Sequence, residues 1–139
     1  LSLHDALPIL DDGPNLVTPE GLTQIEGHVA RIEEALKSEN NPLLRETLAR
    51  DLRYWVHQRS TAEVVARAGE DGIVAFGSRV TVSRKGREQS FRIVGVDEAA
   101  PPRGLISFRS PLAVAILGSQ EADTIGSPLG EIAILKVEN

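Results

Sequence analysis

Apolar residues between positions 22 and 36 recur at intervals of three and four, the spacing of one face of a helix. They are Leu22, Ile25, Val29, Ile32 and Leu36. Thr18, Pro19 and Glu20 precede them and form a helix start, because a Thr side chain can cap free backbone amides and proline suits the first helical position. The pattern therefore predicts a helix that ends near Ser38 and carries a heptad seam.

A second helix is expected after a tight turn. Asn41 and Pro42 stand where a cap and a first helical residue belong. The apolar residues that share one face of this helix are Leu44, Leu48, Leu52, Trp55, Ala62 and Val65. Because the connection is short, the two helices are expected to form an antiparallel hairpin.

The pattern changes to strands beyond a glycine-rich break at 69–72. Alternating or short apolar runs predict strands at 79–83, 90–94, 104–108, 123–125 and 130–137. Lys85-Gly86 predicts a hairpin turn between the first two strands, and Ser110-Pro111 opens a short apolar helix that Gly118 ends. Leu135 is out of phase in the last strand. The fold class is therefore α+β, with an antiparallel sheet and one short helix after a helical hairpin.

Composition fits a folded protein and narrows its chemistry. The chain has 139 residues, of which 41% are hydrophobic and 25% are charged. It has no cysteine, which excludes disulfides, thiolate zinc sites and cysteine nucleophiles. Its three histidines are scattered and only 4% of residues are aromatic, which argues against a histidine metal site and against base stacking. No apolar run is long enough to span a membrane. We predict no cofactor and no metal.

Charge is unevenly distributed along the chain. The formal net charge is -5, yet residues 79–109 hold seven basic residues against three acids. This segment can attract an acidic partner. The basic run Arg84–Arg87 is interpreted either as a solvated hairpin tip or as a docking point, and Asp97 and Glu98 are interpreted as solvated loop acids.

The first residues do not match the rest of the chain. LSLHDALPI lacks the basic start of a signal peptide and looks like translated sequencing adapter. We expect residues 1–16 to be a foreign or disordered leader, residues 17–68 a helical hairpin, and residues 69–139 the sheet domain. Phosphate-binding loops, zinc-protease motifs and nucleophile elbows are absent from the sequence, so it predicts no enzyme of its own.

Four ordered segments carry a family resemblance. They read FGSRVTV at 76–82, FRIVGVDEA at 91–99, LIS at 105–107 and SPLAVAILG at 110–118. Together they resemble the C-terminal domain of the Gre transcript-cleavage and elongation factors of bacterial RNA polymerase. VTPEGL at 17–22 is similar to the start of the family's coiled coil, so the resemblance spans about residues 17–137.

The resemblance implies a fold and a partner. The fold is an FKBP-like domain behind an antiparallel coiled-coil hairpin. The function is a cytoplasmic, monomeric regulator of transcription elongation that docks on the rim of the polymerase secondary channel and meets nucleic acid only indirectly, with no membrane contact. The polymerase-docking residues that it implies are Ile106, Ser107, Ser110, Pro111, Leu112 and Ala113.

The hairpin tip departs from the family. In Gre factors two acidic tip residues help the polymerase hold a catalytic magnesium, and the polymerase then cleaves its own transcript. Here the hairpin is shorter, and the expected tip is Ser38, Glu39, Asn40 and Asn41, with one carboxylate. We therefore expect polymerase binding without stimulation of cleavage.

Two alternatives stay open. One is a short-hairpin protein similar to the regulator of nucleoside diphosphate kinase, which acts by polymerase binding alone. The other is an FKBP-like prolyl isomerase, which requires an aromatic-lined pocket. Residues 69–139 supply only Phe76, Phe91 and Phe108 for such a pocket.

Overall fold

The computed structural model describes residues 13–66 and 69–139. These residues divide into two compact units, which we describe separately. One unit holds most of the helical pair, Glu20–Glu63, and the other holds Leu16–Pro19 with Val64–Asn139. Most of the expected leader, residues 1–12, lies outside the described residues.

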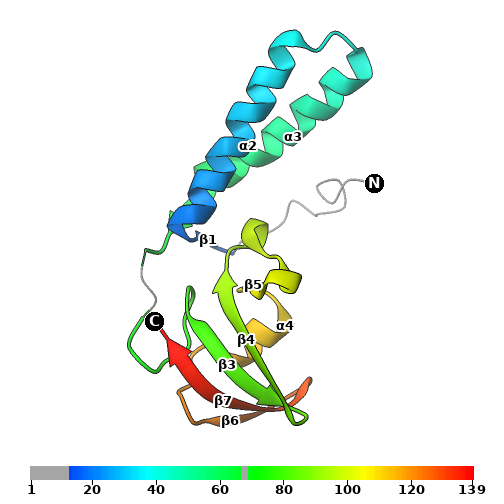
Figure 1. Cartoon of the computed structure of the whole chain (residues 1–139). Helices are drawn as coiled ribbons and strands as arrows, with labels where there is room; N and C mark the ends of the chain where they lie inside the picture. Colours follow the sequence, from blue (N-terminus) through cyan, green and yellow to red (C-terminus); the bar gives the residue numbers. More distant parts are fainter. Residues whose placement is uncertain (1–12, 67–68) are drawn as a thin grey trace. The chain divides into compact units, whose positions relative to one another are not determined.

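Two helices of equal length make the first unit (Figure 1). Helix α2 covers Pro19–Ser38 and α3 covers Pro42–Thr61, each with 20 residues. Ile25 and Val29 of α2 are buried, and Trp55 of α3 stacks on His28 with ring centroids 4.0 Å apart. The predicted bounds of α2 and the predicted start of α3 are confirmed, and the buried residues lie on the predicted apolar faces.

The end of α3 differs from the prediction. We expected the helix to continue to Val65, but it ends at Thr61, and Ala62–Val64 forms strand β2. Val64 and Val65 are β-branched and lose rotamer freedom in a helix, which favours the extended conformation.

The first described residues overlap the end of the expected leader. Asn15–Val17 forms strand β1, which pairs with β2. Leu16 packs against the hydrophobic core of the sheet unit, and the Val17 carbonyl accepts a hydrogen bond from the Val65 N–H at 2.9 Å. Leu16 and Val17 thus contact the sheet unit, and the leader of residues 1–16 stays a prediction.

A five-stranded sheet forms the second unit (Figure 1). Its order is β5-β4-β3-β7-β6, and the strands are β3 (Arg79–Arg84), β4 (Arg87–Val94), β5 (Leu105–Ser107), β6 (Thr124–Ser127) and β7 (Gly130–Glu138). The sheet and the helices confirm the mixed α+β class. The FKBP-like classification and the coiled-coil hairpin stay predictions.

One pairing corrects the expected all-antiparallel sheet, because β5 runs parallel to β4. The connection between them contains two 3-10 helices, η1 (Val96–Glu98) and η2 (Pro101–Arg103). Parallel neighbours need a crossover rather than a tight turn, and these two short helices supply it.

A bulge explains the out-of-phase residue in β7. Thr81 faces Lys136 and Val82 faces Ile134, so Leu135 is the extra residue between them. Its side chain is 42% exposed, whereas Ile132, Ile134 and Val137 are all buried. The bulge thus keeps the apolar side chains of β7 on the core side on both sides of the irregularity.

Helix α4 (Pro111–Ile116) packs on the core face of the sheet. The core joins buried side chains of β3, β4 and β7 to those of α4: Val80, Val82, Phe91, Ile93, Ile132, Ile134, Leu112, Ala113 and Ile116. This burial leaves the remaining side of α4 facing outward.

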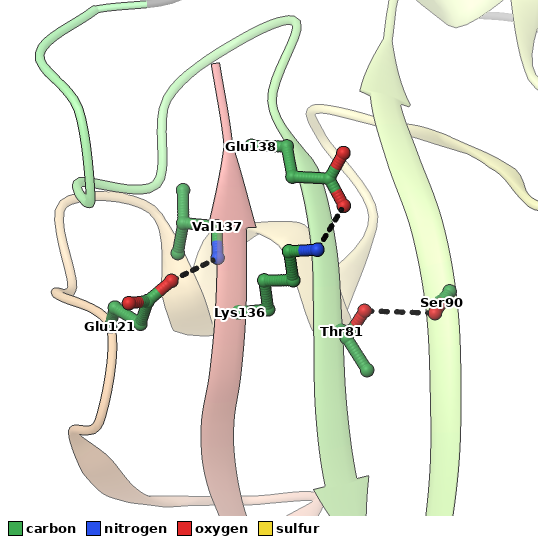
Figure 2. Close-up of polar contacts among 6 residues, drawn as sticks. All are labelled: Thr81, Ser90, Glu121, Lys136, Val137 and Glu138. Atoms are coloured by element: carbon green, nitrogen blue, oxygen red, sulfur yellow. Dashed lines mark hydrogen bonds and ion pairs between the residues drawn. The ribbon is translucent and has the colours of Figure 1, made fainter.

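Beyond the end of β6, a side chain takes the place of a strand as the hydrogen-bond partner of β7. The pairing of β6 reaches only Ala133, and further along β7 the Val137 N–H donates to the Glu121 carboxylate at 2.9 Å. Figure 2 shows this bond beside a Thr81–Ser90 hydroxyl bond of 2.9 Å between β3 and β4.

In residues 13–66 and 69–139 no helix is both long and apolar enough to cross a membrane.

Candidate functional site

Serine side chains organise the segment from β5 to α4. The Ser107 hydroxyl accepts a hydrogen bond from the Arg109 N–H at 3.0 Å, and the Ser110 N–H donates to the Ser107 carbonyl at 2.9 Å. Ser110 then caps α4, since its hydroxyl accepts from the Ala113 N–H at 3.3 Å and Pro111 takes the first turn. These hydrogen bonds fix the conformation of residues 107–110 at the start of α4.

The cap is the first testable feature of this segment. We expect Ser110→Ala to lower the free energy of unfolding by about 1 kcal/mol, because the Ala113 N–H loses its partner. Urea denaturation followed by circular dichroism measures this loss. Ser119→Ala is the matched control, since within the described residues the Ser119 side chain forms no hydrogen bond. An equal loss for both variants would contradict the capping role.

Burial divides the docking residues suggested by the sequence into two groups. Leu112 is 9% exposed and Ala113 is fully buried, so both belong to the core. Ile106, Ser107 and Ser110 are half-buried, and Pro111 is exposed.

Residues that sequence reasoning missed complete an apolar surface on α4. Val114 is 62% exposed and Leu117 is 36% exposed. Pro111, Val114 and Leu117 occur every third residue, the first two within α4 and Leu117 at its C-terminal cap, and we call these three residues the outer face of α4. The sequence signal was available, because in the segment SPLAVAILG every residue from Pro111 to Leu117 is apolar, more than one buried helix face requires.

An arginine precedes α4 in the chain. The Arg109 guanidinium carbon is 5.3 Å from the centre of the Phe108 ring, a cation–π arrangement. Phe108 in turn contacts Phe76 edge-on, with centroids 5.5 Å apart. The Arg109 charge thus lies on an aromatic pair, two residues before Pro111 in the chain.

The turn between α2 and α3 contains the second group of predicted residues, Ser38, Glu39, Asn40 and Asn41. Asn41 caps α3, because its side-chain oxygen accepts hydrogen bonds from the Leu43 and Leu44 N–H groups at 2.9 and 3.3 Å. Glu39 accepts from the Asn41 N–H at 3.1 Å. The one carboxylate of the turn therefore serves the turn itself.

Two further features set the character of this turn. The Arg45 guanidinium donates to the Leu36 and Glu39 carbonyls, both at 2.7 Å. Leu43 and Leu44 are 75% and 51% exposed. The turn therefore presents two exposed leucines and a cation beside its one carboxylate.

We found no metal centre in the described parts of the chain, where no three His, Asp or Glu side chains gather in a suitable arrangement. Hard divalent cations take several oxygen ligands. Glu39 is alone at the turn, and the neighbouring Glu34 pairs with Lys37 at 3.1 Å.

Glu98 has a role that the sequence did not predict. Its carboxylate accepts hydrogen bonds from the Thr18 N–H and the Gly95 N–H, both at 3.0 Å, and from the Thr18 hydroxyl. Thr18 is fully buried. Glu98 therefore fixes the Leu16–Pro19 segment to the sheet unit, and its interpretation as a solvated loop acid is wrong.

Comparison with known proteins identifies relatives. A family model described as "Transcription elongation factor, GreA/GreB, C-term" matches residues 69–139. GreA of Buchnera aphidicola is 36% identical over 80 residues, which cover 53% of this chain and 50% of that protein. GreB of Pseudomonas putida is 38% identical over 105 residues, which cover 73% of this chain and 64% of that protein. The chain spans about half the length of the GreA relatives that it matches.

The chain is also similar to chains in solved structures. GreA factor homolog 1 of Thermus thermophilus is 18% identical, with 91% of this chain and 100% of that chain covered and a TM-score of 0.42. A GreA/GreB factor of Nitrosomonas europaea is 20% identical, with 92% and 100% covered and the same TM-score. The family model, which covers about half of the chain and contains β3 to β7 and α4, shows that the chain belongs to the GreA/GreB family of transcription elongation factors.

Proposed function

We propose that this chain is a regulator of transcription elongation that binds bacterial RNA polymerase through the outer face of α4 and does not stimulate transcript cleavage. The observation that carries the proposal is the exposure of Val114 in α4 and of Leu117 at its C-terminal cap, because the other side of this helix belongs to the core. This helix lies within residues 69–139, which match the family model.

Val114 and Leu117 keep apolar area in contact with water. Apolar area that stays in contact with water on a rigid helix is available to a partner without reorganisation. Arg109, two residues before Pro111 in the chain, adds a charge that can select an acidic rim around an apolar centre, the usual composition of protein interfaces. Ser107 and Ser110 act as positioning residues, because their hydroxyls hydrogen-bond the backbone that leads from β5 into α4.

The turn between the helices supports binding without cleavage. Glu39 is the one carboxylate there and is engaged by the Asn41 N–H, and Arg45 places a positive charge on the same turn. A second acid that would complete a pair of magnesium ligands is not part of Ser38–Asn41. At about 1.5 Å per residue, each 20-residue helix is about 30 Å long. The protein would act on the polymerase by occupancy and would not itself be an enzyme.

The alternatives can be ranked on the same observations. A factor similar to the regulator of nucleoside diphosphate kinase also binds polymerase without cleavage, and the turn composition is compatible with it. A prolyl isomerase requires an aromatic-lined pocket, but Phe91 and Phe76 are buried in the core at 1% and 7% exposure. We therefore favour a polymerase-binding regulator that works where the polymerase is, in the bacterial cytoplasm.

A binding titration tests the proposal. The full chain, labelled with a fluorophore, is titrated with bacterial RNA polymerase core enzyme, and anisotropy is measured. We expect saturable one-to-one binding that unlabelled GreA competes away, because both would use the same docking region. Absence of saturable binding would refute the proposal, and binding that GreA cannot displace would refute the shared site.

A further inference from the structure

Residues of the β3–β4 and β6–β7 turns line a groove. In Figure 1 the two turns lie at the same end of the sheet. Its volume is about 880 Å³, within the range of about 300–1,000 Å³ that ligand-binding clefts occupy. The lining residues are Arg84, Lys85, Arg87, Glu88, Gln89, Pro128 and Leu129. None of them belongs to α4 or to the turn between the helices, so this groove is separate from the surfaces discussed above.

The β3–β4 turn concentrates positive charge in this groove. Lys85 and Gly86 have φ values of 54° and 77°, as expected for a two-residue turn with both residues left-handed. The turn places Arg84 directly opposite Arg87. Like charges at directly opposed positions are unfavourable, and an uncharged Asn-Gly pair would close the same turn. The fold therefore does not require these cations.

The cations also lack internal partners. In the parts of the chain that the structure describes, the side chains of Arg84, Lys85 and Arg87 form no hydrogen bond or ion pair. Glu88 contributes the one carboxylate of the lining, against three positive groups. An anionic ligand can relieve this excess, and arginine favours carboxylates or phosphates because its fork matches their oxygens.

The opposite wall is apolar and held in place. The Ser127 hydroxyl accepts from the Leu129 N–H at 3.1 Å and donates to the Gly130 carbonyl at 2.8 Å. Leu129 is half-buried and packs against the core, and Pro128 is exposed beside it. A ligand with an aliphatic group therefore meets a wall that is already ordered.

We propose that this groove binds an extended acidic segment of a partner protein. Its carboxylates pair with Arg84 and Arg87, and an aliphatic side chain lies on Pro128 and Leu129. A nucleic acid fits less well, because no aromatic ring lines the groove for base stacking.

The test uses the full chain and a fluorescein-labelled peptide of alternating acidic residues and leucine. We expect saturable binding by fluorescence anisotropy, with amide shifts in NMR spectra confined to residues 84–89 and 127–130. Arg84→Gln with Arg87→Gln is expected to weaken binding by at least about tenfold, since two charge-assisted contacts are lost. Lys85→Asn removes a charge while keeping the turn, because Asn tolerates positive φ, and it is expected to weaken binding less.

The matched control is Arg103→Gln, which removes an exposed arginine outside the groove. It is expected to leave peptide affinity unchanged. An equal loss for Arg103→Gln would show attraction by net charge alone and would overturn the proposal. Displacement of the peptide by an oligothymidine of equal charge would favour a nucleic acid as the ligand and would overturn the proposal. Absence of peptide binding would overturn the proposal too. Polymerase binding is read separately, so either hypothesis can fail alone.

Discussion

Replacing Val114 with glutamate is expected to weaken polymerase binding strongly while the protein stays folded. Val114 is 62% exposed at the centre of the outer face of α4, so a glutamate there remains solvated in the free protein. On binding, the carboxylate would be buried against an apolar surface, which is strongly unfavourable. Central interface residues typically contribute about 2 kcal/mol or more, so we expect affinity to fall by about 30-fold or more.

The control for this variant is Leu135→Glu. Leu135 is an exposed leucine, 42% accessible, at the β7 bulge. The Leu135→Glu variant introduces the same charge on the same unit but outside α4, so its polymerase affinity is expected to equal that of the wild type. Circular dichroism confirms folding of both variants. Wild-type affinity for Val114→Glu would exclude the outer face of α4 as the docking surface.

Replacing Glu98 with alanine is expected to destabilise the sheet unit strongly. The change removes the shared acceptor of the Thr18 N–H, the Thr18 hydroxyl and the Gly95 N–H. Leaving a buried donor unsatisfied costs about 1–3 kcal/mol, so we expect a loss of about 3 kcal/mol or more. Thermal and urea denaturation measure it, and the melting temperature is expected to fall by roughly 10 °C.

Two companion variants sharpen this test. Glu131→Ala removes an exposed acid on β7 and is expected to change stability by less than about 0.5 kcal/mol. Gly95→Ala disturbs the same contacts of Glu98 by a steric clash, because a Cβ atom at position 95 would lie 2.7 Å from the Leu16 carbonyl oxygen. It should destabilise like Glu98→Ala. A loss below about 1 kcal/mol for both Glu98→Ala and Gly95→Ala would show that the cluster does not fix Leu16–Pro19.

Much of the fold was predictable because the decisive signals are local. Asn41-Pro42 and Ser110-Pro111 begin helices as expected, and Lys85-Gly86 forms the expected turn. Leu135 was recognised as out of phase, but the bulge that explains it depends on the register of β7 against β3. The parallel β4–β5 pair was missed for the same reason, since strand partners are chosen by tertiary packing.

The candidate surface was predictable only in part. Sequence resemblance drew attention to the segment from Ile106 to Ala113, but it cannot tell which side of a six-residue helix is buried. The packing of Leu112 and Ala113 on the sheet turns Val114 and Leu117 outward. Glu98 was misinterpreted because its partner Thr18 is 80 residues away in sequence. Contacts of that kind leave no periodic signal.

The most direct measurement uses backtracked elongation complexes of bacterial RNA polymerase with magnesium present. The full chain is added, and its binding and the length of the RNA are followed in the same sample, with GreA as a positive control for shortening. We predict stable binding with RNA length unchanged, because Glu39 is the one acid of the turn and is engaged by the Asn41 N–H. Shortening of the RNA from its 3′ end would contradict the account of the turn, and absence of binding would contradict its central claim.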